Sequence, residues 1–288
     1  MPPLQKHPLL LFAAYLGASG VLAALIAPLI WPLLDYPFER VLSRLALLIA
    51  ALLLVPVLRI AALTRSEIGF HGFAAGRFAR DWCLGIALIL PPAVFFLLID
   101  FRVFDPRVAA EPLEVARVAL LGVISGLAIG VFEETLFRGV LLGVWLRVQP
   151  KVAIWGSSAA YALVHFVEAD EHAVPDSFWA GFQQLGAAFA PLASPGAYWD
   201  SFVGLFLLGV GLAWVRLRTG SLWTSIALHA AFVTFLKVYK DVTIRDIDVP
   251  LAWVVGTYDN FVGEATALWL LVILIVAWLW SRQPRPFG

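Results

Sequence analysis

Three ionisable residues fall within six positions of one apolar stretch of this sequence. Glu133, Glu134 and Arg138, in the run EETLFR, are the only charged residues for eight or more positions on either side. An ionisable side chain at membrane depth costs at least about 2.5 kcal/mol, so a group of three needs a reason to be there. The four-residue spacing lets Glu134 and Arg138 pair on a helix. Glu133 points about 100° away and has neutral residues three and four positions to either side, so it is the carboxylate that we expect to do chemistry.

Two histidines supply partners at a matching depth. His165 lies in the apolar run 152–167, and His229 lies in the run 222–239. Counted from the nearest basic residue at the inner end of each run, Glu133 and His165 are each 14 residues deep and His229 is 11. At about 1.5 Å per residue, these depths are roughly 21, 21 and 16 Å. We therefore expect three helices to bring one carboxylate and two imidazoles to a common level.

This group is suited to hydrolysing an amide inside a membrane. A carboxylate held at low dielectric constant becomes a competent base near neutral pH. With one imidazole beside it, Glu133 can polarise a water molecule, and the second imidazole can donate a hydrogen bond to the oxyanion of a tetrahedral intermediate. We expect no cofactor. Zinc is the alternative, because two histidines and a glutamate are a known catalytic ligand set, although HExxH and the serine motif GxSxG are both absent.

The elements that must position these residues are membrane spans. Of the 288 residues, 61% are hydrophobic and 14% are charged, whereas about a quarter are charged in a soluble domain. A helical span needs about 20 apolar residues, and the first run is too long for a cleaved signal peptide, so we expect an uncleaved anchor. The sequence predicts an all-α polytopic integral membrane protein with about eight transmembrane helices. The apolar runs are 8–34, 42–63, 82–104, 115–148, 152–167, 199–217, 222–239 and 262–280.

Charges between the spans give the expected orientation. Eleven of the twenty Lys and Arg residues fall on the side of the N-terminus, and several tryptophans mark that boundary, as the positive-inside rule and aromatic belts require. We expect a multi-pass protein of the cell inner membrane with both termini cytoplasmic and the lipid bilayer around it. Twenty basic residues balance twenty acidic ones, so charge gives no reason to expect nucleic acid as a partner. The single cysteine, Cys83, excludes an intramolecular disulfide.

The expected organisation is one membrane domain over residues 1–288, with a core of catalytic helices over 115–239. An outer loop over 168–198 carries aromatic and apolar residues at helical spacing from Phe178 to Phe189, which predicts a helix lying in the membrane interface. Asp176 is placed to cap the start of this helix. We expect the acidic segment before it, which includes His172, to be solvated.

At its ionisable residues the sequence resembles the CPBP family of intramembrane proteases, also called the CAAX-protease and bacteriocin-processing or Abi family. The first family motif, EExxxR, is matched in full by the residues from Glu133 to Arg138. The second, FxxxH, is matched from Tyr161 to His165, with tyrosine in place of phenylalanine. The third is a histidine followed four residues later by Asn or a similar polar residue, which here is His229 and Val233. The resemblance covers about residues 115–239.

The resemblance implies an eight-helix fold and a glutamate-type intramembrane endopeptidase that cuts a membrane-anchored peptide or protein. By matched position, Glu133 and His165 activate water, and His229 helps to form the oxyanion hole. Glu134 and Arg138 form a supporting pair that fixes Glu133. The substrate classes that the resemblance suggests are prenylated C-termini, bacteriocin leaders and C-terminal sorting tails.

One departure from the family pattern keeps other functions open. Val233 cannot complete the oxyanion hole, and Ser225 and Thr234 carry the nearby hydroxyls that can replace the missing donor. The same departure suits a non-catalytic immunity or peptide-binding membrane protein on this scaffold. A proton-coupled transporter that uses Glu133 and the histidines as a relay is a third possibility, although no internal repeat is visible in the sequence.

Overall fold

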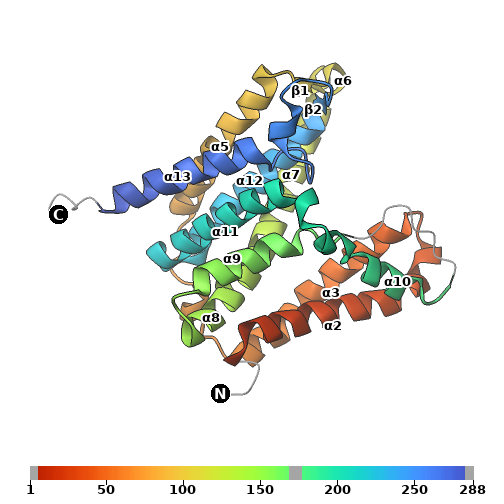
Figure 1. Ribbon diagram of the computed structural model, residues 1–288, viewed down its shortest axis with the longest axis vertical. Helices are drawn as coiled ribbons and strands as arrows, with labels where there is room; N and C mark the ends of the chain where they lie inside the picture. Colours follow the sequence, from red (N-terminus) through yellow and green to blue (C-terminus); the bar gives the residue numbers. More distant parts are fainter. Residues whose placement is uncertain (1–5, 169–176, 283–288) are drawn as a thin grey trace. The chain divides into compact units, whose positions relative to one another are not determined.

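The structure is a computed structural model that describes residues 6–168 and 177–282 (Figure 1). Within these residues, seven helices are long and apolar enough to cross a membrane. The predicted class of all-α polytopic membrane protein is therefore confirmed. The predicted fifth span is shorter than expected, because α9 (Ala153–Val164) has only 12 residues. The seven long helices are Pro8–Leu33, Phe38–Ala61, Ala75–Leu98, Pro112–Val148, Trp199–Thr219, Leu222–Val242 and Glu264–Arg282.

The chain divides into two compact units. Unit 1 comprises the described residues of 1–68 and 135–197, and unit 2 comprises those of 69–134 and 198–288. The boundary between the units therefore falls inside the EETLFR run, between Glu134 and Thr135.

A pair of long helices forms one side of unit 1. Helices α2 (Pro8–Ile30) and α3 (Phe38–Ala61), joined through the short η1 (Trp31–Leu33), pack side by side (Figure 1). Their shared core contains small residues of α2 and larger ones of α3. The Tyr15 hydroxyl also donates a hydrogen bond to the Ala50 carbonyl at 2.8 Å. The core residues are Ala23, Ala27, Phe38, Val41, Leu42, Ile49 and Ala180.

Helix α10 (Ala180–Ala187) covers α2. Gly181 makes this approach possible, because a Cβ at that position would collide with the Ala24 carbonyl. The structure thus has a helix where the aromatic periodicity predicted one, although α10 is only eight residues long. Phe178, Trp179 and Phe189 lie outside it and are exposed. Asp176 and His172, with the acidic segment around them, lie outside the described residues.

All but one of the remaining elements of unit 1 follow the boundary at Thr135. They are the π-helix η2 (Thr135–Leu141), α8 (Leu142–Val148), α9, and the 3₁₀ turns η3 (Ala190–Ala193) and η4 (Pro195–Ala197). The short α4 (Arg65–Ile68) contacts η2. Arg147 of α8 donates to the Ala61 and Ala62 carbonyls at 3.1 and 3.0 Å, so a cation satisfies the end of α3, as expected at a helix C-terminus.

Helix α12 is the central element of unit 2. Its apolar window is 56% buried, compared with 11% in α13. Helix α12 (Leu222–Val242) contacts α5 (Ala75–Leu98), α7 (Pro112–Glu134) and α11 (Trp199–Thr219), while α13 (Glu264–Arg282) packs mainly on α11. The shorter elements are α6 (Pro106–Ala109) and η5 (Ala252–Val255).

Two short strands extend the ends of α5 and α12. Strands β1 (Arg102–Phe104) and β2 (Thr243–Arg245) pair antiparallel, with Val103 opposite Ile244. Arg102 is buried here, and burial lowers the pKa of its guanidinium. The strands tie the loop after α5 to the end of α12.

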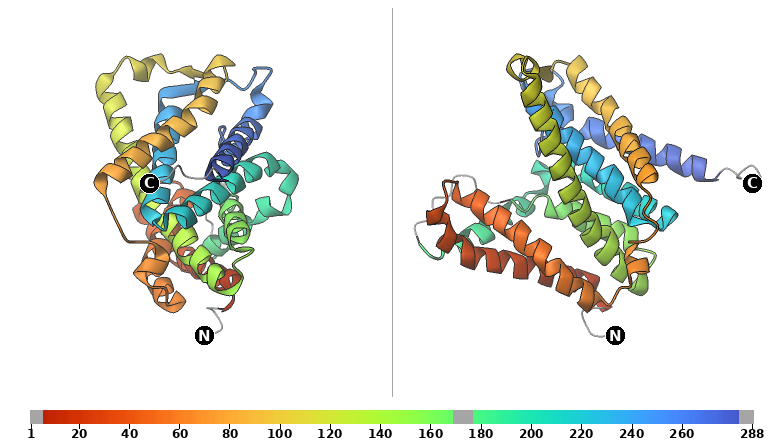
Figure 2. Two further views of the ribbon diagram at one scale, coloured as in Figure 1. Left: turned by 90° about the vertical axis from the view of Figure 1, so that its left-hand side faces the viewer. Right: turned by 180° about the vertical axis from the view of Figure 1, so that it is seen from behind.

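Helices α7 and α12 run side by side (Figure 2) because glycines let their backbones approach. Gly122, Gly126 and Gly130 are all buried on one face of α7. A Cβ on Gly130 would lie 2.9 Å from the Ala230 Cβ, and one on Gly126 would lie 2.5 Å from the Ala230 carbonyl oxygen. Small residues at this spacing allow close helix packing in membranes, and this glycine seam is the interface that sets the register of α7 on α12.

Candidate active site

The EETLFR run lies where α7 changes into a π-helix. The α-helix ends at Glu134, and η2 begins at Thr135. Turns of π-helix are rare and occur frequently at functional sites. Every residue of η2 is buried, which is the setting in which irregular helical backbone is tolerated in a membrane protein. The sequence predicted one regular helix here, because the local composition gives no sign of the wider turns.

In unit 2, one imidazole lies between two carboxylates. His229 Nδ1 is 2.8 Å from Glu134 Oε1, and His229 Nε2 is 3.8 Å from Glu133 Oε2. The first distance is a hydrogen bond, while the second is too long for a direct one. Glu133 and Glu134 are adjacent on α7, and their carboxylates thus lie at the two different nitrogens of the His229 ring.

The two carboxylates differ in exposure. The Glu134 side chain is 0% exposed and the His229 side chain is 4% exposed, whereas that of Glu133 is 21% exposed. Glu133 is therefore the more accessible of the two carboxylates. Glu134 holds the ring from the buried side, in agreement with the rule that buried charges are paired or hydrogen-bonded.

The hydrogen bond to Glu134 determines what His229 can do at its other nitrogen. An ionised carboxylate only accepts, so His229 must donate from Nδ1. A neutral ring then presents a lone pair at Nε2, and only an imidazolium presents an N–H there. An ionised Glu134 beside an imidazolium has the same number of protons as a protonated Glu134 that donates to Nδ1 of a neutral ring. In both arrangements Nε2 carries an N–H. The Glu134–His229 pair must therefore hold an additional proton before Nε2 can donate.

This pairing is a feature that sequence reasoning missed. The helical spacing predicted Arg138 as the partner of Glu134, and that pairing stays a prediction. The glycine seam is the signal that could have identified His229 as the partner of Glu134, because Ala230 and Thr234 of α12 face Gly126 and Gly130 of α7. That register places His229 beside the end of α7.

In unit 1, Arg138 and His165 share the side chain of Tyr161. The Arg138 guanidinium lies 4.2 Å from the centre of the Tyr161 ring, a distance for a favourable cation–π contact. The centre of the His165 ring lies 4.6 Å from that of the Tyr161 ring, and its Nδ1 is 2.7 Å from the Tyr161 carbonyl oxygen. Phe137 packs edge-on against Tyr161 at 5.1 Å. Tyr161, at the aromatic position of the second motif, thus packs against both Arg138 and His165.

The Tyr161 carbonyl also sets the tautomer of His165. A carbonyl can only accept, so Nδ1 carries the proton and a neutral ring presents its lone pair at Nε2. His165 follows directly after the last residue of α9, where the predicted span had placed it inside a helix. That Glu133 lies close to His165, as the matching depths predicted, stays a prediction.

The candidate donors for the missing part of the oxyanion hole differ in their hydrogen bonds. Val233 is half-buried on α12, where the resemblance expects a polar residue. The Thr234 hydroxyl donates to the Gly122 carbonyl at 3.2 Å. The Ser225 hydroxyl is fully buried and has no hydrogen-bond partner in the part of the chain that the structure describes. Ser225 is therefore the better candidate of the two.

Metal binding was the alternative use of these side chains. Across residues 6–168 and 177–282, no three His, Cys, Asp or Glu side chains are grouped as a metal site. The zinc alternative and the absence of a cofactor both stay predictions.

Comparison with known proteins gives one match. Residues 114–235 match the family model described as type II CAAX prenyl endopeptidase Rce1-like. Neither the comparison with curated proteins nor the comparison with solved structures found a match. The matched segment contains all five predicted site residues, which are Glu133, Glu134, Arg138, His165 and His229.

Proposed function

Because residues 114–235 of this chain match the family model described as type II CAAX prenyl endopeptidase Rce1-like, we propose that the protein is a glutamate-type intramembrane endopeptidase. The observation that carries the proposal is the placement of one accessible and one buried carboxylate, Glu133 and Glu134, at the two nitrogens of His229.

Glu133 acts as the general base. Its partly exposed carboxylate accepts a proton from a water molecule as the oxygen of that water attacks the scissile carbonyl carbon. The proton then passes to the leaving amine when the tetrahedral intermediate collapses, so Glu133 ends the cycle ionised. The Nε2 lone pair of His165, set by the Tyr161 carbonyl, is the proposed second acceptor that orients the same water.

His229 stabilises the negative charge of the intermediate. As an imidazolium held at Nδ1 by Glu134, it donates from Nε2 to the developing oxyanion. Glu134 is then a positioning residue, because its carboxylate keeps the additional proton on the ring and fixes the ring orientation. Arg138 is the proposed supporting cation for this pair of glutamates.

The proposed substrate is a membrane-anchored peptide or protein cut near its C-terminus. The family description names prenylated CAAX substrates, and bacteriocin leaders and sorting tails are the other proposed classes. We place the protein in the cell inner membrane with both termini in the cytoplasm, on the evidence of the basic residues on that side.

The test compares peptide termini in membranes of cells that express the wild type or Glu133→Gln. The substitution keeps the size and polarity of the side chain but removes the base. New termini that appear only with the wild type would support proteolysis and identify the substrate. Identical termini, with both proteins folded and equally abundant, would refute it.

A second candidate function is peptide binding without cleavage, as in an immunity protein. Val233 is the observation that favours it, because an apolar side chain replaces the donor that the resemblance expects. Binding of a membrane-anchored peptide that is equally tight in the wild type and Glu133→Gln, with no turnover by either, would establish this function.

A further inference from the structure

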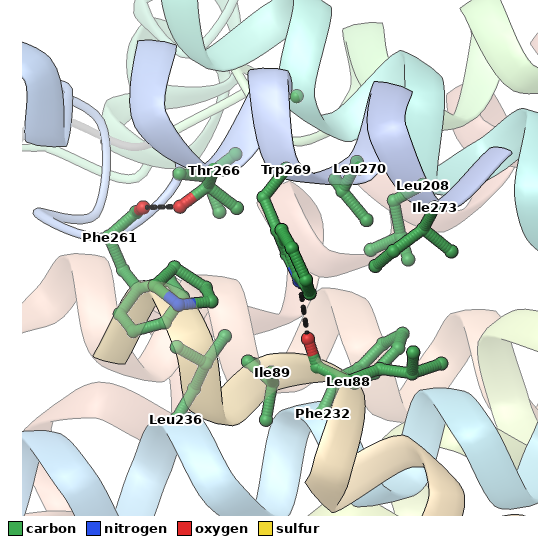
Figure 3. Close-up of a pocket in the computed structure, with 13 residues that line it drawn as sticks. Leu88, Ile89, Leu208, Phe232, Leu236, Phe261, Thr266, Trp269, Leu270 and Ile273 are labelled. Carbon is green, nitrogen blue, oxygen red and sulfur yellow. Dashed lines mark hydrogen bonds between the residues drawn. The ribbon is translucent and has the colours of Figure 1, made fainter. Parts of the chain in front are cut away.

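Unit 2 contains a second concave site away from the ionisable residues. It lies between α5, α11, α12 and α13 and holds about 460 Å³ of empty space, its open mouth included (Figure 3). Its wall includes Ile89, Leu208, Phe232, Leu236 and Leu270, and no charged residue lines it.

The polar groups of this pocket are already used. The Trp269 indole N–H donates to the Leu88 carbonyl at 2.7 Å, and the Thr266 hydroxyl donates to the Phe261 carbonyl at 2.6 Å (Figure 3). Proline explains the first bond, because Pro92 has no N–H to offer the carbonyl four residues before it. A ligand with amides or a head group would meet no partner here, so the pocket suits a ligand that makes no hydrogen bonds.

The pocket continues into a groove on the outer side of α5 and α13. Pro92 and Trp269 line both spaces, and the groove adds Pro91, Phe95, Leu268 and Val272 among others. Leu268 is 64% exposed and Val272 is 41% exposed. Both helices are long and apolar enough to span a membrane, so these exposed apolar side chains face the hydrocarbon of the bilayer. The mouth of the pocket thus opens where lipid chains are the surrounding solvent.

The depth of the pocket also matches a lipid chain. Pro92 lies six residues before the end of α5, and Trp269 lies five residues after the start of α13. At about 1.5 Å per residue, the mouth is roughly 8 to 9 Å below these helix ends. The space extends deeper, to Leu208 and Ile273.

We propose that this pocket binds one acyl chain of a bilayer phospholipid as a resident apolar ligand. The chain enters between α5 and α13 beside Trp269 and contacts Phe232 and Leu236 of α12. These residues lie three and seven positions after His229, so the lipid supports the helix that carries the candidate active-site imidazole. The proposal does not depend on peptidase activity.

The test uses the full-length protein in phosphatidylcholine liposomes with a trace of phosphatidylcholine that carries a diazirine in one acyl chain. After irradiation, the positions of the adducts are mapped by mass spectrometry. Adducts on Phe232 and Leu236, which lie on the central helix, are expected. Adducts confined to outward residues such as Leu268 and Leu271 would overturn the proposal.

Two neighbouring residues of α13 give a matched pair of variants. Leu270 lines the pocket, whereas Leu271 does not and is 42% exposed. Leu270→Trp is expected to reduce the adducts on α12 at least fivefold, and Leu271→Trp is expected to leave them unchanged. Equal labelling of α12 in both variants would contradict the proposal. Displacement of the probe by an equimolar farnesylated peptide would also overturn it, because the pocket would then take the lipid of a substrate.

Discussion

At the scale of single residues, Glu133 and Glu134 are neighbours in the sequence but have different proposed roles, general base and positioning residue. Their side chains have the same chemistry, but one is 21% exposed and the other is fully buried against His229. An accessible carboxylate can exchange protons with water, whereas a buried one hydrogen-bonded to an imidazole positions that ring and holds its proton. The proposed division between base and positioning residue follows from burial.

Variants of Glu134 test the hydrogen bond at His229 Nδ1. In Glu134→Gln, the amide can donate to Nδ1, so a neutral ring keeps an N–H at Nε2. This variant should lose at most about tenfold in kcat.

Glu134→Leu is the control, because leucine has a similar size and no hydrogen-bonding group. It should lose more than about 100-fold in kcat. Values of kcat for the wild type and the two variants check this expectation. An equal loss in Glu134→Gln and Glu134→Leu would show that the hydrogen bond at Nδ1 does not prepare His229 as a donor.

At the scale of elements, the α7–α12 seam determines whether the carboxylates reach His229. Gly126 is its tightest position, since a Cβ there would collide with the Thr234 hydroxyl and the Ala230 carbonyl. Gly126→Ala should therefore separate the helices and destabilise the protein by about 1–3 kcal/mol. Turnover should fall further, by up to about 100-fold, because a shift of about 1 Å is enough for such a loss.

Gly17→Ala is the control for this substitution. Gly17 lies on α2, and a Cβ there would have no heavy atom within 4 Å. Melting temperature and kcat should both stay at the wild-type level in this variant. If Gly126→Ala behaved in the same way, the close approach of α7 and α12 would not be needed for the site.

The bond between Trp269 and Leu88 allows a double-mutant test of the α5–α13 contact. Trp269→Phe removes the indole N–H and leaves the Leu88 carbonyl without this donor, so we expect a loss of about 1 kcal/mol. Pro92→Ala supplies a backbone N–H that can bond the same carbonyl within α5. The double variant should therefore lose less than the sum of the two single changes, measured by thermal unfolding in one detergent. Additive losses would contradict this role for Trp269.

At the scale of the whole molecule, composition and hydrophobic runs were enough to predict the membrane class and most spans, because lipid exposure constrains every residue of a span. The site was predictable only in part. EETLFR and the two histidines stood out as ionisable residues in apolar runs, but the Glu134–His229 bond depends on how α7 packs on α12. The π-helix after Glu134 and the short α9 also depend on burial, which a single sequence does not display.

The acid stability of the fold should depend on an ion pair in unit 1. Arg147 donates to Glu67 through Nε at 3.0 Å, and this hydrogen bond is the main cause that lowers the pKa of the Glu67 carboxyl from 4.5 to about 2. Since the folded pKa is depressed, the pair stabilises the protein fully above about pH 4.5, and its contribution is lost as the pH falls towards 2.

Melting curves of the wild type and Glu67→Gln from pH 3 to pH 8 check this expectation. Glu67 is 41% exposed, so the difference in Tm should be small because solvent screens the pair. It should be constant above about pH 5 and shrink below about pH 4. A difference that grows in acid would contradict the assignment.

The most direct measurement of the central claim is turnover by the purified protein in lipid nanodiscs with farnesylated C-terminal peptides. Glu133→Gln should retain the wild-type Tm and peptide affinity but lose at least about 100-fold in kcat, because it lacks the general base. Arg117→Gln, at the start of α7 and far along the helix from Glu133, should cleave at the wild-type rate. Equal cleavage by the wild type and Glu133→Gln would contradict the role of Glu133 as the base.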